Sequence, residues 1–165
     1  MKHWQTIVGL FVVAVLAGGV CWVNQRGGQP PGPGAASSGQ AVRDDGSLPD
    51  VTLAPSTAEE GNVRIALALA PNPPVAFAKM RVRVRVESAG SPVPLDGGRV
   101  SFEMTMPMGD YRYTLAAAQD GSYGAEVVLP MCVSGARRWY ATVEGAVAGQ
   151  PRVARFRLDL APPLR

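Results

Sequence analysis

From residue 63 to residue 160 the chain alternates apolar and polar positions with a period of two, which is the pattern of half-buried β-strands. The clearest run is 80–86, where methionine and valine alternate with three arginines. Turn signals such as Asp120-Gly121 separate the runs at intervals of about ten residues. The pattern predicts an all-β, seven-stranded immunoglobulin-like sandwich with no amphipathic helix. The predicted strands cover 63–69, 80–86, 100–106, 111–115, 123–129, 139–143 and 156–160.

Residues 7–23 form an uncharged apolar run with Lys2 before it and Arg26 after it. The run is longer than the apolar core of a signal peptide, about 7 to 15 residues, and it reaches the lower limit of a membrane span, about 17 residues. We therefore expect one N-terminal transmembrane helix that acts as an uncleaved signal anchor. Lys2 predicts that residues 1–6 lie in the cytoplasm and that the remainder is exported. Lipidation of Cys21 is disfavoured, because Val20 stands where processing needs a small residue.

Residues 24–61 are rich in glycine, proline, serine and alanine. This composition predicts a disordered linker, followed by a β-sandwich domain over 62–161.

Sulfur side chains crowd into two short segments, 104–108 and 131–132. Thioether and thiol ligands select Cu(I), whereas imidazole and carboxylate favour other metals. The residues in question are Met104, Met106, Met108, Met131 and Cys132. Methionine also fills irregular cores, and Met104 in particular has the parity of a core residue. Met108 stands in an expected turn between Pro107 and Gly109, where a long apolar side chain needs a partner.

The second sulfur segment follows Pro130 and precedes Ser134-Gly135, again just past a strand end. If the strands that lead into the two segments are neighbours, the two turns meet at one rim of the sandwich. Copper(I) accepts a small set of soft ligands, so Met106, Met108, Met131 and Cys132 would form a complete site there. Trp139 and Tyr111 would either shield this site or belong to the core.

Cys132 has no evident disulfide partner, because Cys21 is expected inside the bilayer. An odd exported cysteine is buried, paired between molecules or kept for chemistry. The chain has one histidine, His3, at its extreme N-terminus. A blue-copper site, a histidine-based zinc site and a Ser-His-Asp triad are therefore excluded from the folded part, and we expect no enzymatic activity.

The net charge is +3 and the pI is near 9.2, owing largely to arginine. Arg81, Arg83 and Arg85 share one face of a predicted strand. That face is either a solvated outer surface or a contact for anionic lipid or an acidic partner. It has no aromatic residues on which bases would stack, so nucleic acid is not expected as a partner.

The sulfur-bearing segments resemble the FixH and YtkA-like group of small bacterial proteins. The resemblance lies in Met104-Thr105-Met106-Pro107-Met108-Gly109, then in Asp120-Gly121-Ser122-Tyr123, and finally in the stretch from Leu129-Pro130-Met131 to Trp139. It implies one membrane helix in the bacterial inner membrane and a β-sandwich on the periplasmic side. It also implies a role in copper handling or in the assembly of copper-containing respiratory oxidases, with Met104, Met106, Met108 and Met131 as thioether ligands.

Two functions follow from these observations. The first is a membrane-anchored periplasmic copper(I)-binding protein that buffers copper or delivers it to a copper-containing oxidase or a copper transporter. The second is a non-metal interaction module of a membrane complex, in which the methionines are core and Cys132 is buried. Met108 and Cys132 facing each other at an open rim would favour copper, and burial of both would favour the interaction module.

Overall fold

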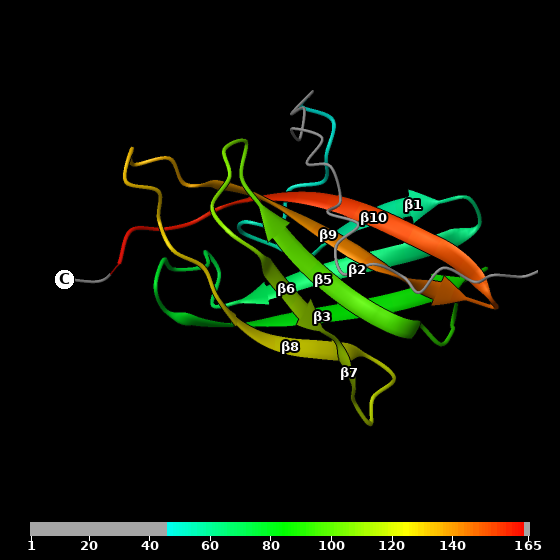
Figure 1. The fold of residues 1–165 in the computed structure, drawn as a ribbon. Coiled ribbons are helices and arrows are strands. Elements are labelled where there is room, and N and C mark those ends of the chain that lie inside the picture. Colours follow the sequence, from blue (N-terminus) through cyan, green and yellow to red (C-terminus); the bar gives the residue numbers. More distant parts are fainter. Residues whose placement is uncertain (1–45, 164–165) are drawn as a thin grey trace, which may run out of the picture. The chain divides into compact units, whose positions relative to one another are not determined.

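A computed structural model describes residues 46–163 of the chain (Figure 1). The predicted cytoplasmic N-terminus, the predicted anchor and most of the predicted linker lie outside the described residues. Within 46–163 there is no helix, and so none long and apolar enough to cross a membrane. The described strands are β1 (Ser56–Glu60), β2 (Val63–Ala70), β3 (Lys79–Ser88), β4 (Ser91–Pro92), β5 (Asp96–Glu103), β6 (Tyr111–Thr114), β7 (Ala116–Ala117), β8 (Tyr123–Val128), β9 (Arg138–Val147) and β10 (Gln150–Asp159).

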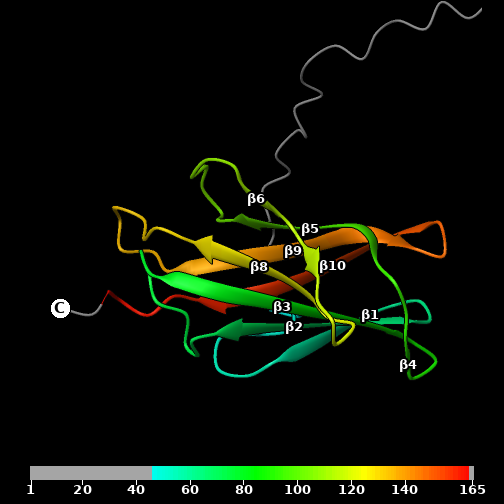
Figure 2. The same cartoon turned by 90° about the horizontal axis from the view of Figure 1, so that it is seen from below.

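The strands form two antiparallel sheets that face each other (Figures 1 and 2). One sheet has the order β1-β2-β3-β8-β7, with the short β4 paired to β3. The other has the order β10-β9-β5-β6. The predicted all-β architecture is therefore confirmed, and each of the seven predicted strands is present.

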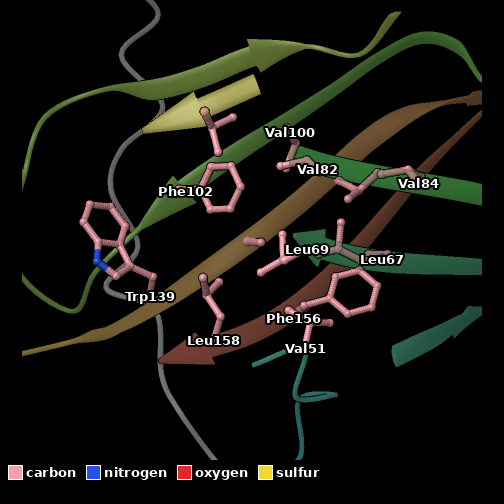
Figure 3. Packing of buried hydrophobic residues seen from close by; sticks show 14 of the residues in the cluster. Val51, Leu67, Leu69, Val82, Val84, Val100, Phe102, Trp139, Phe156 and Leu158 are labelled. Atoms are coloured by element: carbon pink, nitrogen blue, oxygen red, sulfur yellow. The ribbon is translucent and has the colours of Figure 1, made fainter. Parts of the chain in front are cut away.

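A single hydrophobic core fills the space between the sheets, because the inward positions of both sheets are apolar. On β3, for example, Val82 and Val84 are buried while Arg83 between them is exposed. The opposite sheet contributes Phe102, Trp139 and Phe156 (Figure 3). The β-branched and aromatic residues that predict the strands are thus the residues that pack between the sheets.

The domain begins earlier than predicted, and the linker boundary at residue 61 is wrong. Val51 is fully buried, and its N–H donates to the carbonyl of Arg157 at 2.9 Å. β1 then pairs along its whole length with β2. Residues 49–60 resemble a linker in sequence because β1 is an edge strand of small and acidic residues with few apolar positions.

The third predicted strand also ends sooner than expected. β5 stops at Glu103, so Met104 and Met106 belong to the following loop. This loop must carry the chain from β5 to its neighbour β6, and it contains Pro107, which lacks an N–H, and Gly109 at φ 108°. A strand cannot continue through that turn.

Leu95 packs closely over two glycines. A larger residue at one of them therefore tests how tightly the core is packed. An alanine Cβ at Gly145 of β9 would lie 2.5 Å from Leu95 Cδ1 and 3.1 Å from the carbonyl oxygen of Asp96. We expect Gly145→Ala to lower the free energy of unfolding by about 1–3 kcal/mol, as overpacking typically does. Urea denaturation followed by circular dichroism measures this change. Gly124→Ala is the matched control, since its Cβ would meet Val82 only at 3.4 Å. Equal stability of Gly145→Ala and the wild type would contradict the tight packing.

Candidate functional site

Three loops gather at one end of the sandwich, which we call the sulfur end: 71–78, 104–110 and 129–137 (Figures 1 and 2). The loop 104–110 leaves β5 and the loop 129–137 enters β9. β5 and β9 are antiparallel neighbours, with Glu103 opposite Tyr140, so these two loops emerge side by side. The C-terminal segment ties the end together, because Leu160 N–H donates to the carbonyl of Arg137 at 3.0 Å.

The predicted meeting of the two sulfur-bearing loops is observed, but for a different reason from the one expected. The strand that leads into Met131 and Cys132 is β8, which lies in the opposite sheet from β5 and pairs with β3 and β7. The loop 129–137 crosses from one sheet to the other. The sulfurs therefore meet because β9, not β8, is the neighbour of β5.

Cys132 is fixed by hydrogen bonds of its own loop. Its carbonyl accepts from Gly135 N–H at 2.9 Å, and its N–H donates to the carbonyl of Ala136 at 3.4 Å. Gly135 has φ 80°, a conformation that glycine adopts without strain. The side chain of Cys132 is 3% exposed and forms no disulfide within the described residues. The local sequence Cys132-Val133-Ser134-Gly135 thus builds a tight turn that holds the thiol inward.

The thiol makes two polar contacts. Its Sγ lies 3.1 Å from the Sδ of Met106, with the S–H donating to the thioether. The Ser134 hydroxyl donates to Cys132 Sγ, also at 3.1 Å. A thiol, a thioether and a hydroxyl are therefore in direct contact at the sulfur end.

The pKa of the Cys132 thiol is lowered from its ordinary value. The largest cause is the hydrogen bond from the Ser134 hydroxyl, followed by the backbone N–H of Ser134, and burial opposes the shift. These donors favour the thiolate over the thiol. The thiolate is the form that binds metals and attacks electrophiles.

The other predicted ligands lie at the same end but differ in exposure. Met106 is the most accessible, at 39%. Met108 and Met131 are half-buried and pack against the core, and Met104 is 7% exposed within it. The structure therefore joins Met106 to Cys132 directly, whereas it gives Met104 the core position that its parity indicated.

Tyr111 and Trp139 also meet near this end. Their ring centroids are 5.2 Å apart in an edge-to-face arrangement. Trp139 is fully buried, and its Nε1–H has no hydrogen-bond partner. A buried donor without an acceptor is costly, at about 1–3 kcal/mol. Trp139 therefore belongs to the core, and Tyr111 packs against it.

Other metal chemistries find no support in the described part of the chain. Residues 46–163 bring no three histidine, cysteine, aspartate or glutamate side chains together as a metal site. The candidate site is therefore made of sulfur and one hydroxyl.

The predicted arginine face is exposed on the outer side of β3. Asp120 lies 3.8 Å from Arg83 and 3.5 Å from Arg85, so the turn before β8 offsets part of its charge. The pKa of Asp120 is held below its usual range. The main cause is the hydrogen bonds from Ser122, and the charges of these two arginines contribute less. A hollow of about 290 Å³ beside Arg83 is lined by Ala68 and Ala70 as well.

Sequence reasoning missed the part played by Ser134. The available signal was the spacing Cys-x-Ser-Gly, in which a serine two residues after the thiol precedes a turn glycine. Serine hydroxyls in turns commonly bond to groups two residues away.

Comparisons with known proteins found no relative by sequence. No protein-family profile matches the chain, and no curated protein matches its sequence. A crystal structure of a DUF4426 family protein from Pseudomonas aeruginosa is similar at a TM-score of 0.47 and 12% identity, over 66% of this chain and 98% of that one.

The hydrogen bond from Ser134 makes a testable difference to the thiol. We expect Ser134→Ala to raise the pKa of Cys132, because the thiolate loses its strongest donor. The ultraviolet absorbance of the thiolate, followed against pH in a Cys21→Ser background, measures the change. Ser101→Ala on β5 serves as a control that should leave the titration unchanged. An unaltered pKa in Ser134→Ala would contradict the assigned contact.

Proposed function

We propose that the chain is a membrane-anchored copper(I)-binding protein of the bacterial inner membrane, with its sandwich on the periplasmic side. In this role it buffers copper or delivers it to a copper-containing oxidase or a copper transporter, and it makes and breaks no covalent bond. The observation that carries the proposal is the contact between Cys132 Sγ and Met106 Sδ at 3.1 Å. A thiol and a thioether side by side are the donors that Cu(I) prefers.

The spacing of the two sulfurs is close to that of a ligand pair but shorter. Taking a metal–sulfur bond of about 2.3 Å, as for zinc, two ligands at a tetrahedral angle stand about 3.8 Å apart. Met106 would have to withdraw by about 0.7 Å to admit an ion between them. It can do so cheaply, because it is partly exposed and methionine has three rotatable bonds.

The protonation of Cys132 supports the same role. A thiol must lose its proton before it binds a metal, so metal affinity depends on the thiol pKa. The donors from Ser134 lower that pKa and therefore the cost of deprotonation near neutral pH.

Met108 and Met131 are the side chains that would complete the site. Both lie in the loops that carry Met106 and Cys132, and both are half-buried at the surface of the core. Met104 is less suited to be a ligand, because its side chain already packs in the core.

We also propose the finer fold assignment, an immunoglobulin-like sandwich. The seven predicted strands divide into β2-β3-β8 and β10-β9-β5-β6. Immunoglobulin domains divide their strands in a similar way, with three or four in one sheet and the remainder in the other. The short strands β1, β4 and β7 extend one sheet.

The rival function is a non-metal interaction module, and one observation favours it. Cys132 is 3% exposed and Met104 is part of the core, as expected if the sulfurs only pack. The thiol would then be a small buried hydrophobe whose hydrogen bonds satisfy its polarity. Met106, which is 39% exposed, is the residue that this rival explains least well.

Copper(I) titration of the full chain in detergent separates the two functions. The experiment uses anaerobic conditions, a competing chelator and a Cys21→Ser background, so that the cysteine of the expected anchor does not contribute. We expect one-to-one binding that Cys132→Ser weakens by more than about 100-fold and Met106→Leu by about tenfold, since even outer groups of a metal site often matter that much. Met108→Leu and Met131→Leu should each weaken binding to a smaller extent.

The matched control is Met80→Leu, a buried methionine of β3 outside the predicted ligand set. It should leave the affinity unchanged. Absence of binding, or binding that ignores both Cys132→Ser and Met106→Leu, would refute the copper function and favour the interaction module.

A further inference from the structure

Exposed apolar side chains are unevenly distributed over the sandwich. Of the six large apolar side chains that are exposed within residues 46–163, five lie at the sulfur end. These five are Leu53, Phe77, Met106, Val128 and Val133. The sixth, Val153, lies on β10 opposite Glu144. Single exposed apolar residues are ordinary, but their concentration at one end needs a cause.

Each of the five is placed at the sulfur end by its position in a strand or loop or by the contacts of a neighbouring residue. Leu53 follows Thr52, whose hydroxyl accepts from Asp159 N–H where β10 finishes. Val128 is paired with Lys79 at the start of β3. Met106 and Val133 belong to the two sulfur-bearing loops themselves, and Val133 is fully exposed next to the buried Cys132.

Phe77 is the most unusual of the five. Its N–H donates to the carbonyl of Leu129 at 2.9 Å, and its φ is 62°. A bulky residue seldom adopts this left-handed conformation, so the surrounding structure must impose it. The result is an aromatic side chain that is 59% exposed. An arrangement that costs energy and also leaves an aromatic ring in water suggests a surface that is covered in use.

The opposite end of the sandwich, which we call the turn end, is built differently. Its connections are short and turn at glycines with positive φ, among them Gly61, Gly90, Gly121 and Gly149. None of the six exposed apolar side chains belongs to these turns. The two ends therefore differ in chemistry as well as in loop length.

Basic side chains accompany the apolar ones. Lys79 and Arg81 are exposed near the start of β3, and Arg137 is exposed in the loop before β9. The acidic residues Glu103 and Asp110 are exposed at the same end, so the basic residues do not stand alone there. Glu126 is within 3.8 Å of Lys79, but both side chains are well exposed, so the pair is weak. Apolar and aromatic tips mixed with lysine and arginine are typical of surfaces that lie in the membrane interface.

We propose that the sulfur end contacts the lipid bilayer, with its apolar tips in the interface and its basic residues near anionic headgroup phosphates. This inference rests on the membrane anchor of the proposed function. Residues 24–45 lie outside the described residues, and their composition predicts a linker with a span of about 25 Å. The ten-residue strands of the sandwich are about 33 Å long. A tether shorter than the domain keeps the domain at the bilayer surface, where one end or face must turn to the lipid.

A bilayer fits these residues better than a protein partner does. The tips belong to five separate segments of the chain, whereas a protein interface needs close shape complementarity. Lipids adapt to separate tips. The contact would also bring the sulfur site to the membrane surface, where an integral membrane partner would lie.

The test uses the full chain in lipid nanodiscs that contain a gadolinium-chelating lipid, with methyl groups of valine and methionine observed by NMR. We expect the signals of Val133 and Met106 to be lost through paramagnetic broadening while that of Val93, near the turn end, stays sharp. Val133→Ser should restore the Met106 signal, and so should Phe77→Ser. Val153→Ser, the matched exposed valine, should not. Discs without anionic lipid should give weaker broadening.

Four results would overturn the inference. Equal broadening at both ends, or broadening at the turn end alone, would exclude the proposed orientation. Sharp signals at both ends would exclude lipid contact and leave the apolar end for a protein partner, without affecting the copper(I) titration. A chain that does not co-purify with the discs would contradict the anchor and the inference built on it.

Discussion

The antiparallel register between β5 and β9 is the constraint on which the candidate site depends. Phe102 stands opposite Ala141 and Glu103 opposite Tyr140, so the loop that leaves β5 emerges beside the loop that enters β9. A shift of one residue would turn Phe102 from the core to the outside, and burial therefore fixes the register. As a consequence, Met106 and Cys132 meet although 26 residues separate them. The packing of the core, which fixes this register, therefore brings the two side chains together.

Alternation of apolar and polar residues predicts the strands that have it, and strands without this alternation are missed. Each strand with a buried apolar stripe was located, because a half-buried strand needs that stripe. β1 has the composition of a linker, since the strand is short, polar and at an edge of its sheet. The neighbours of each strand were harder to infer. The run 123–129 was expected beside the run 100–106, yet β8 pairs with β3 in the other sheet, and no local pattern encodes which sheet a strand joins.

The candidate site shows the same division between local and long-range information. The two sulfur-bearing loops were found from residue types and from Pro107 and Gly135, which mark strand ends and turns. The donor from Ser134 to Cys132 was not found, because it depends on how the turn folds back on itself. The exposure of Met106 was equally hard to predict. Its position in the alternating pattern is that of a core residue, but β5 ends before it, so Met106 lies in a loop.

One segment of backbone connects the candidate site with the proposed lipid contact. Cys132 and Val133 are consecutive, yet the first is buried and the second is fully exposed. The turn that Gly135 permits directs the thiol toward Met106 and the valine outward. The loop can therefore shield a sulfur and present an apolar tip at once, without a separate structure for each task. Because the two side chains point apart, a change at Val133 alters the surface while leaving the hydrogen bonds of the thiol in place. Binding at the sulfurs and contact at the surface are thus separable by substitution, even though they share a loop.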